Sequence, residues 1–140
     1  MRLKDSKLLR ELCFIDGSWM GADNGGALDV KNPATAQKLG SIPNMGAAET
    51  RRAIAAAAAA LPAWKARTAK ERAVILRRWF DLMLEHQDDL ATLMTAEQGK
   101  PLAESKVEIQ YAASFIEWIS TFDSANGLPC SAVISVARSS

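Results

Sequence analysis

The chain has 140 residues, of which 49% are hydrophobic, so it has the length of one ordinary domain and enough apolar residues for a core. Seventeen Lys and Arg residues against sixteen Asp and Glu residues give a formal net charge of +1, which argues against nucleic-acid binding. The longest uninterrupted apolar run, residues 53–61, is too short to span a bilayer, and the charged N-terminus lacks the apolar core of a signal peptide. We therefore expect a cytoplasmic protein with reduced cysteines that binds neither nucleic acid nor a membrane.

Residues 12–42 carry the signals of short strands and turns. In LCFIDGSWM an Asp-Gly pair separates two apolar patches, a pattern typical of a tight β-hairpin. The segment ALDVKNPAT predicts a strand that ends at Asn32-Pro33, and QKLGSIP predicts another that ends at Pro43.

From residue 46 onward, the spacing of apolar residues predicts four helices, at about 46–61, 69–85, 87–98 and 101–119. The second begins with Thr68 and Glu71, a capping box in which each residue satisfies a free backbone amide of the other. Its predicted buried face consists of Ile75, Trp79, Leu82 and Met83. The expected fold class is therefore α/β, with a short β element followed by four helices.

Residues 119–140 differ from the rest of the chain in composition. They are rich in serine and carry few charges, and SANGLP is turn material. The segment SAVISV has strand character but no visible partner strand. We expect this part to be a divergent, poorly ordered tail.

Few residues suggest chemistry. His86, the one histidine, lies at a predicted helix junction with no nucleophile near it in sequence, so we interpret it as structural. Cys13 falls in an apolar strand, and nothing near Cys130 would lower the pKa of its thiol. The segment QGK is not a phosphate-binding loop, because Met94 and Pro101 stand where that motif needs Gly and Ser or Thr. We assign no catalytic or cofactor-binding residue.

Glu97 raises a specific question. Gly99, Lys100 and Pro101 predict a joint between two helices: the glycine ends the first helix and the proline begins the second. Glu97 then lies in the last turn of a helix, where a negative charge is unfavourable by about 0.3–1 kcal/mol. Two explanations remain open: a surface pair with Lys100, or a bound cation.

Long segments of the chain, among them VKNPATAQKLGSIP, EQGKPLAE and YAASFIEW, resemble the N-terminus of the NAD(P)-dependent aldehyde dehydrogenase superfamily. Within it, the chain is similar to the succinate-semialdehyde dehydrogenases over about residues 10–118. The resemblance implies that residues 1–118 are the N-terminal segment of a cofactor-binding domain. It also implies a much longer enzyme that oxidises succinate semialdehyde to succinate with NAD or NADP, using a cysteine nucleophile and a glutamate base. No motif for those two residues or for the cofactor follows Trp118 here.

The resemblance further implies a structural monovalent cation. In relatives its ligands are an acidic side chain before the Gly-Lys-Pro turn and two backbone carbonyls before Asn-Pro. The matching positions are Glu97, Val30 and Lys31, although the usual acidic residue is Asp.

We expect this chain alone to be an inactive N-terminal fragment that binds no cofactor, with an aldehyde substrate only for the full-length form. A frameshift, a gene interruption or a misread reading frame would explain the change of composition at residue 119. The alternative is a non-enzymatic helical module that associates with a full-length paralogue in a homo- or hetero-oligomer.

Overall fold

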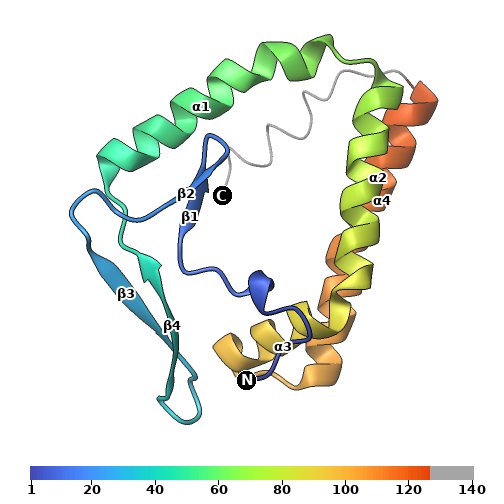
Figure 1. Cartoon of the computed structure of the whole chain (residues 1–140). Coiled ribbons are helices and arrows are strands. Elements are labelled where there is room, and N and C mark those ends of the chain that lie inside the picture. The colour runs from blue at the N-terminus through green and yellow to red at the C-terminus, as the bar shows by residue number, and fades with distance from the viewer. Residues whose placement is uncertain (127–140) are drawn as a thin grey trace.

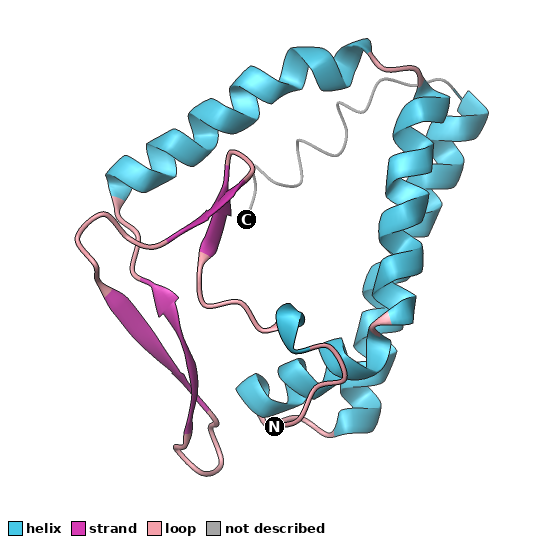
Figure 2. Cartoon of the chain, in the orientation of Figure 1, coloured by secondary structure: helices cyan, strands magenta, loops and turns pink. Residues whose placement is uncertain are grey.

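The computed structural model describes residues 1–126, so the expectation of a poorly ordered tail falls largely on residues 127–140, outside the described part. A 3-10 turn, η1 (Ser6–Leu8), precedes four strands, and four helices follow them (Figure 1). The strands form hairpins within the first third of the chain, and helices make up most of the remainder (Figure 2). This order confirms the predicted α/β organisation.

The first hairpin joins β1 (Cys13–Ile15) to β2 (Ser18–Met20) in an antiparallel pair, as predicted. Asp16 and Gly17 form its turn with φ angles of 50° and 77°, a left-handed pair that suits the twist of a two-residue hairpin. On one face Phe14 lies opposite Trp19, with ring centroids 5.2 Å apart. Cross-strand aromatic contacts of this kind stabilise short strand pairs.

The second hairpin pairs β3 (Ala27–Lys31) antiparallel with β4 (Lys38–Pro43) in a separate two-stranded sheet. The register shifts between Val30 and Lys31, immediately before the turn. Asn32 closes this turn, since its side-chain oxygen accepts hydrogen bonds from the amides of Ala34 and Thr35 at 2.9 and 3.2 Å. The predicted strand end at Asn32-Pro33 is therefore confirmed.

The first helix, α1 (Ala47–Ala66), is longer than the predicted 46–61 and includes Pro62. Proline inside a helix removes one backbone hydrogen bond, but good helix formers such as Ala63 and Lys65 follow it, and the helix continues. At the other end Glu49 is buried, and its carboxylate accepts hydrogen bonds from the amides of Asp23 and Gly46 at 3.0 and 3.1 Å. Glu49 thus holds the loop after β2 against the start of α1.

The second helix, α2 (Ala69–Glu85), has the predicted bounds and the predicted cap. The Thr68 amide donates to the Glu71 carboxylate at 2.7 Å, and the Glu71 amide donates to the Thr68 hydroxyl at 3.3 Å.

The predicted buried face of α2 is wrong for two of its four members. Ile75 and Trp79 are 43% and 54% exposed, whereas Leu82 and Met83 are half-buried. The buried residues of α2 are Arg72, Ala73 and Phe80. Apolar spacing identifies an amphipathic helix, but α2 has apolar residues on more than one side, and its contact with α4 decides which side is buried.

The third helix, α3 (Gln87–Gln98), has the predicted bounds, and the fourth, α4 (Leu102–Asn126), packs along both α2 and α3. Small residues at these contacts let the helices approach closely: Ala73, Ala91 and Ala113 are buried beside Phe80 and Ile109. One polar contact lies inside this core, where the hydroxyls of Thr95 and Ser105 are 2.8 Å apart and Ser105 has no exposed surface. The bond gives the buried Ser105 hydroxyl a partner within the protein.

The fourth helix extends seven residues beyond its predicted end at residue 119. It therefore includes residues 119–126, the start of the segment that we assigned to a tail. Ser120 and Thr121 both donate their hydroxyl protons to the carbonyl of Glu117 at 2.6 Å, so these side chains fit within the helix. The first strong stop signal in the sequence comes only at Gly127.

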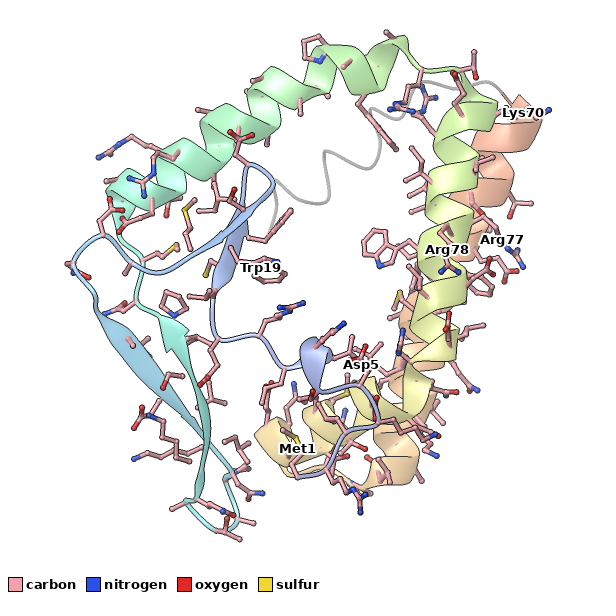
Figure 3. The ribbon with its side chains drawn as sticks, in the orientation of Figure 1. Met1, Asp5, Trp19, Lys70, Arg77 and Arg78 are labelled. Atoms are coloured by element: carbon pink, nitrogen blue, oxygen red, sulfur yellow. The ribbon has the colours of Figure 1, made fainter. Side chains whose placement is uncertain are left out.

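The elements are arranged as an open frame. The two hairpins lie on one side, α2 and α4 run side by side on the other, and α1 connects the two sides (Figure 1). The N-terminal segment, residues 1–12, runs from α3 to the first hairpin and is called the N-terminal strap below (Figure 3). None of the helices in the described part of the chain is long and apolar enough to cross a membrane.

The joint between α3 and α4 also touches the second hairpin. Gly99 adopts a left-handed conformation with φ 74° and ψ 11°, and its amide donates to the carbonyl of Thr95 at 2.9 Å. A Cβ atom at this position would lie 2.9 Å from Cγ of Pro33. Both observations require glycine, because any side chain would be strained and would collide with the turn between β3 and β4.

We predict that Gly99→Ala destabilises the chain more than the same change at a glycine without a neighbour. The left-handed φ alone costs about 1–2 kcal/mol. Gly17→Ala carries a similar φ of 77° in open space, and Gly21→Ala has open space and no positive φ. Urea denaturation should rank the losses as Gly99 largest, Gly17 intermediate and Gly21 near zero. Equal losses at Gly99 and Gly17 would show that Pro33 is not in contact.

Candidate functional site

Glu97 lies exposed in the last turn of α3, as predicted. The surface pair between Glu97 and Lys100 is not formed, because the Lys100 ammonium contacts the carboxylate of Glu108 on α4 instead. Among the residues whose contacts the structure describes, no hydrogen bond or ion pair involves the Glu97 carboxylate. The unfavourable charge at this helix end is therefore not offset by a neighbouring side chain.

A small cavity of about 20 Å³ lies beside Glu97. This volume is enough for about one water molecule or one small ion. Its lining brings together three parts of the chain that are distant in sequence: the strap with Leu9, Arg10 and Glu11, the hairpin with Val30 and residues 39–42, and the end of α3 with Glu97. Two of the three predicted ligand positions, Glu97 and Val30, therefore meet at one cavity, whereas Lys31 is not part of its lining.

The described lining of this cavity contains oxygen-bearing side chains but neither His nor Cys. Within residues 1–126, no group of three His, Cys, Asp or Glu side chains could hold a metal ion. Two carboxylate residues, Glu97 and Glu11, line the cavity together with the cationic Arg10, and with Val30 and residues 39–42 of two strands, which also carry backbone carbonyls. Oxygen ligands of these two kinds are what monovalent and alkaline-earth cations prefer.

The residues of the strap were not foreseen as part of this site. Glu11 places a carboxylate oxygen 2.7 Å from the amide of Ser41, which donates a hydrogen bond to it. Arg10 lies with its guanidinium carbon 4.9 Å from the ring centroid of Trp19, a cation–π contact with the first hairpin. Neither residue belongs to a motif or a periodic pattern, so no signal in the sequence pointed to them.

The acidic pair Asp88–Asp89 lies in the first turn of α3, where the helix dipole favours negative charge. The structure adds a second role, because Asp89 is only 5% exposed and binds the strap. Its two carboxylate oxygens accept hydrogen bonds from the amides of Lys4 and Asp5, each at 2.8 Å. These two amides hold the pKa of Asp89 below its ordinary value.

Asp88 forms two ion pairs beside this contact. Its oxygens lie 2.7 Å from Nζ of Lys106 on α4 and 2.9 Å from Nζ of Lys4 on the strap. Hydrogen bonds to Lys106 and then to Lys4 lower the pKa of Asp88 from 3.8 to about 2. The first turn of α3 therefore joins the strap to α4 through one buried and one exposed carboxylate.

The remaining candidates occupy structural positions. His86 is the residue between α2 and α3, where its amide donates to the carbonyl of Leu82 at 3.1 Å. Cys13 is a half-buried free thiol in β1. Tyr111 is 65% exposed on α4, and its ring packs edge-on against that of Phe115 with the centroids 4.8 Å apart. Cys130 lies outside the described residues.

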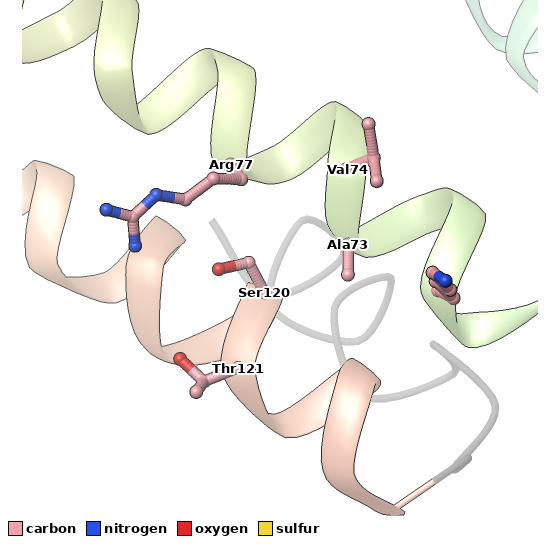
Figure 4. Close-up of a pocket in the computed structure, with 6 residues that line it drawn as sticks. Ala73, Val74, Arg77, Ser120 and Thr121 are labelled. Atoms are coloured by element: carbon pink, nitrogen blue, oxygen red, sulfur yellow. The ribbon is translucent and has the colours of Figure 1, made fainter.

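Two larger hollows, each of about 350 Å³, lie on the surface of the described part. The first lies between α2 and α4 and is lined in part by Ala73, Arg77 and Ser120 (Figure 4). The second lies between the first hairpin and the alanine-rich side of α1. Neither hollow has the glycine-rich turn at a helix N-terminus, followed by an acidic ribose ligand, that holds a dinucleotide.

Comparison with known proteins connects this geometry to a family. The sequence pattern of the aldehyde dehydrogenase family matches residues 19–127. The chain is 69% identical over 118 residues to a glutarate-semialdehyde dehydrogenase of Pseudomonas aeruginosa, and equally identical to the NADP(+) succinate-semialdehyde dehydrogenase of Escherichia coli. Each match covers 84% of this chain and 24% of the relative.

A solved structure gives the same result for the fold. The structure of a succinate-semialdehyde dehydrogenase from Burkholderia pseudomallei superposes with a TM-score of 0.83 at 58% sequence identity, over 85% of this chain and 25% of that one. The chain thus spans about a quarter of the length of the relatives it matches, in their N-terminal part.

Proposed function

Because the chain belongs to the aldehyde dehydrogenase family, we propose that it provides the N-terminal segment of the cofactor-binding domain of an NAD(P)-dependent succinate-semialdehyde dehydrogenase. The observation that supports this most strongly is its 69% sequence identity, over 118 residues, to two semialdehyde dehydrogenases. Both of those enzymes are named for an aldehyde that carries a carboxylate. We therefore expect the full-length form to act on a short aldehyde of this acidic class.

As a separate polypeptide, the chain should not catalyse this oxidation. The reaction needs a nucleophile, a base and a held cofactor in one arrangement, since orientation and electrostatic stabilisation supply most of the rate. We further propose a cytoplasmic location, which the free thiol of Cys13 suits because reducing compartments keep cysteines unpaired.

The activity proposal is tested by an assay of the purified chain with succinate semialdehyde and either NAD or NADP. We predict no reduced cofactor above the level of a sample without protein, whereas an intact semialdehyde dehydrogenase at equal concentration turns over under the same conditions. Turnover by the lone chain at an ordinary enzyme rate, of order 1 per second or more, would contradict the proposal.

We also propose that the cavity beside Glu97 holds a structural monovalent cation, with Glu97 and backbone at Val30 and Lys31 as its ligands. Three observations support this: no hydrogen bond or ion pair within the described residues involves the Glu97 carboxylate, Glu97 shares a cavity with Val30, and the cavity is the size of one small ion. A cation at this point would neutralise a carboxylate placed at the negative end of α3.

The cation proposal predicts that potassium or sodium stabilises the wild-type chain but not Glu97→Gln. At a concentration ten times its dissociation constant, a bound ion adds about 1.4 kcal/mol. Thermal melting should be followed at constant ionic strength, with tetramethylammonium as the exchanged ion so that only ion identity changes. Glu104→Gln is the matched control, since it removes an exposed carboxylate from the start of α4. Equal shifts in wild type and Glu97→Gln would refute the site.

A second candidate function is a helical binding module that associates with a full-length paralogue in a mixed oligomer. The observation in its favour is the set of large apolar side chains left exposed on α2 and α4, with Trp79 at 54%, Phe115 at 52% and Tyr111 at 65%. Exposed apolar patches of this kind often mark protein interfaces. Gel filtration of the chain with an intact semialdehyde dehydrogenase separates the two functions: co-elution favours the module, and separate elution favours the simple segment.

A further inference from the structure

We infer that the N-terminal strap connects the buried carboxylate of Asp89 to the wall of the Glu97 cavity, so that Asp89 acts as a positioning residue for that cavity. Through the strap, Asp89 fixes the shape of the cavity wall, whether or not an ion binds there. Only its consequence for ion binding rests on the proposed function.

One end of the strap is anchored on α3. Both carboxylate oxygens of Asp89 are used by consecutive backbone amides, those of Lys4 and Asp5, and the carboxylate is almost fully buried. The Lys4 side chain adds an ion pair to Asp88. Hydrogen bonds to a buried, charged acceptor are among the strongest in proteins, because the alternative is an unsatisfied charge. Asp5 lies close to α3 in Figure 3.

The other end of the strap forms part of the cavity. Leu9, Arg10 and Glu11 line it, and Glu11 accepts a hydrogen bond from the amide of Ser41, another lining residue. The contact is close, since a Cβ atom added at Gly40 would lie 3.1 Å from the same Glu11 oxygen. Glu11 therefore joins the strap to β4 at the cavity.

The segment between the two anchors is short and ordered. The turn η1 begins with Asp5, whose side chain accepts a hydrogen bond from the Lys7 amide at 3.0 Å. The amides of Leu8 and Leu9 bond back to the carbonyls of Asp5 and Ser6 at 3.2 and 3.3 Å. Because the turn is held by these hydrogen bonds, the strap is a short ordered connection between its two ends. Loss of the anchor at Asp89 should therefore increase the mobility of residues 9–11.

The test is amide hydrogen exchange in the full chain without added potassium or sodium. Asp89→Asn removes the charge and leaves one oxygen for two amides. We expect exchange at Lys4 and Asp5 to accelerate roughly tenfold or more. The same variant should also accelerate exchange at Ser41, which has no contact with Asp89. Asp81→Asn is the matched control, since it neutralises an exposed carboxylate that pairs with Arg77, and it should change neither region.

The readout at Ser41 separates a positioning role from a local structural one. Faster exchange at Lys4 and Asp5 with unchanged exchange at Ser41 would overturn the inference. If Asp89→Asn also accelerates amide exchange in helices that do not contain Asp89, such as α2, the substitution has destabilised the whole chain. A variant that lacks residues 1–5 then replaces it. This deletion removes the anchored end of the strap and leaves Asp89 open to water. Acceleration at Ser41 in the deletion variant supports the inference, and unchanged exchange there overturns it. Because no cation is present, neither result depends on whether Glu97 binds one.

Discussion

The close approach of Gly99 to Pro33 is the contact that brings the helical part of this chain against its second hairpin. It brings the end of α3 against the turn that follows β3, and it is possible only because residue 99 lacks a side chain. Glu97 lies two residues before this contact and Val30 three residues before Pro33, so the same approach places both at one cavity. The strap forms the third part of the cavity wall through Glu11, whose carboxylate accepts a hydrogen bond from Ser41. The strap is itself anchored at Asp89, which accepts a hydrogen bond from the Asp5 amide.

The local features of the fold could be predicted from the sequence because each depends on neighbouring residues. The Asp16-Gly17 hairpin, the Thr68–Glu71 cap and the bounds of α2 and α3 follow from turn chemistry and capping within a few positions. Contacts between distant segments could not be foreseen in this way. The exposure of Trp79 and the hydrogen bonds from the strap to Asp89 are decided by tertiary packing, on which periodicity gives no information.

The same distinction applies to the candidate site. Glu97 drew attention because its charge conflicts with the helix dipole, a local conflict that often marks function. Its partners at the cavity come from segments more than fifty residues away, and the resemblance to a known family, rather than any spacing, indicated Val30. Glu11 and Arg10 had neither kind of signal. The exposed aromatic residues of α4 fit a chain that matches about a quarter of its relatives, in which further elements are available to cover such a surface.

The most direct measurement of the central contact is a nuclear Overhauser experiment on the isotopically labelled chain in solution. The account predicts cross-peaks between the α-protons of Gly99 and the ring protons of Pro33, two residues that the sequence places far apart. Cross-peaks within each helix and hairpin, but none between these two residues, would contradict it, because the end of α3 would then not meet the β3–β4 turn.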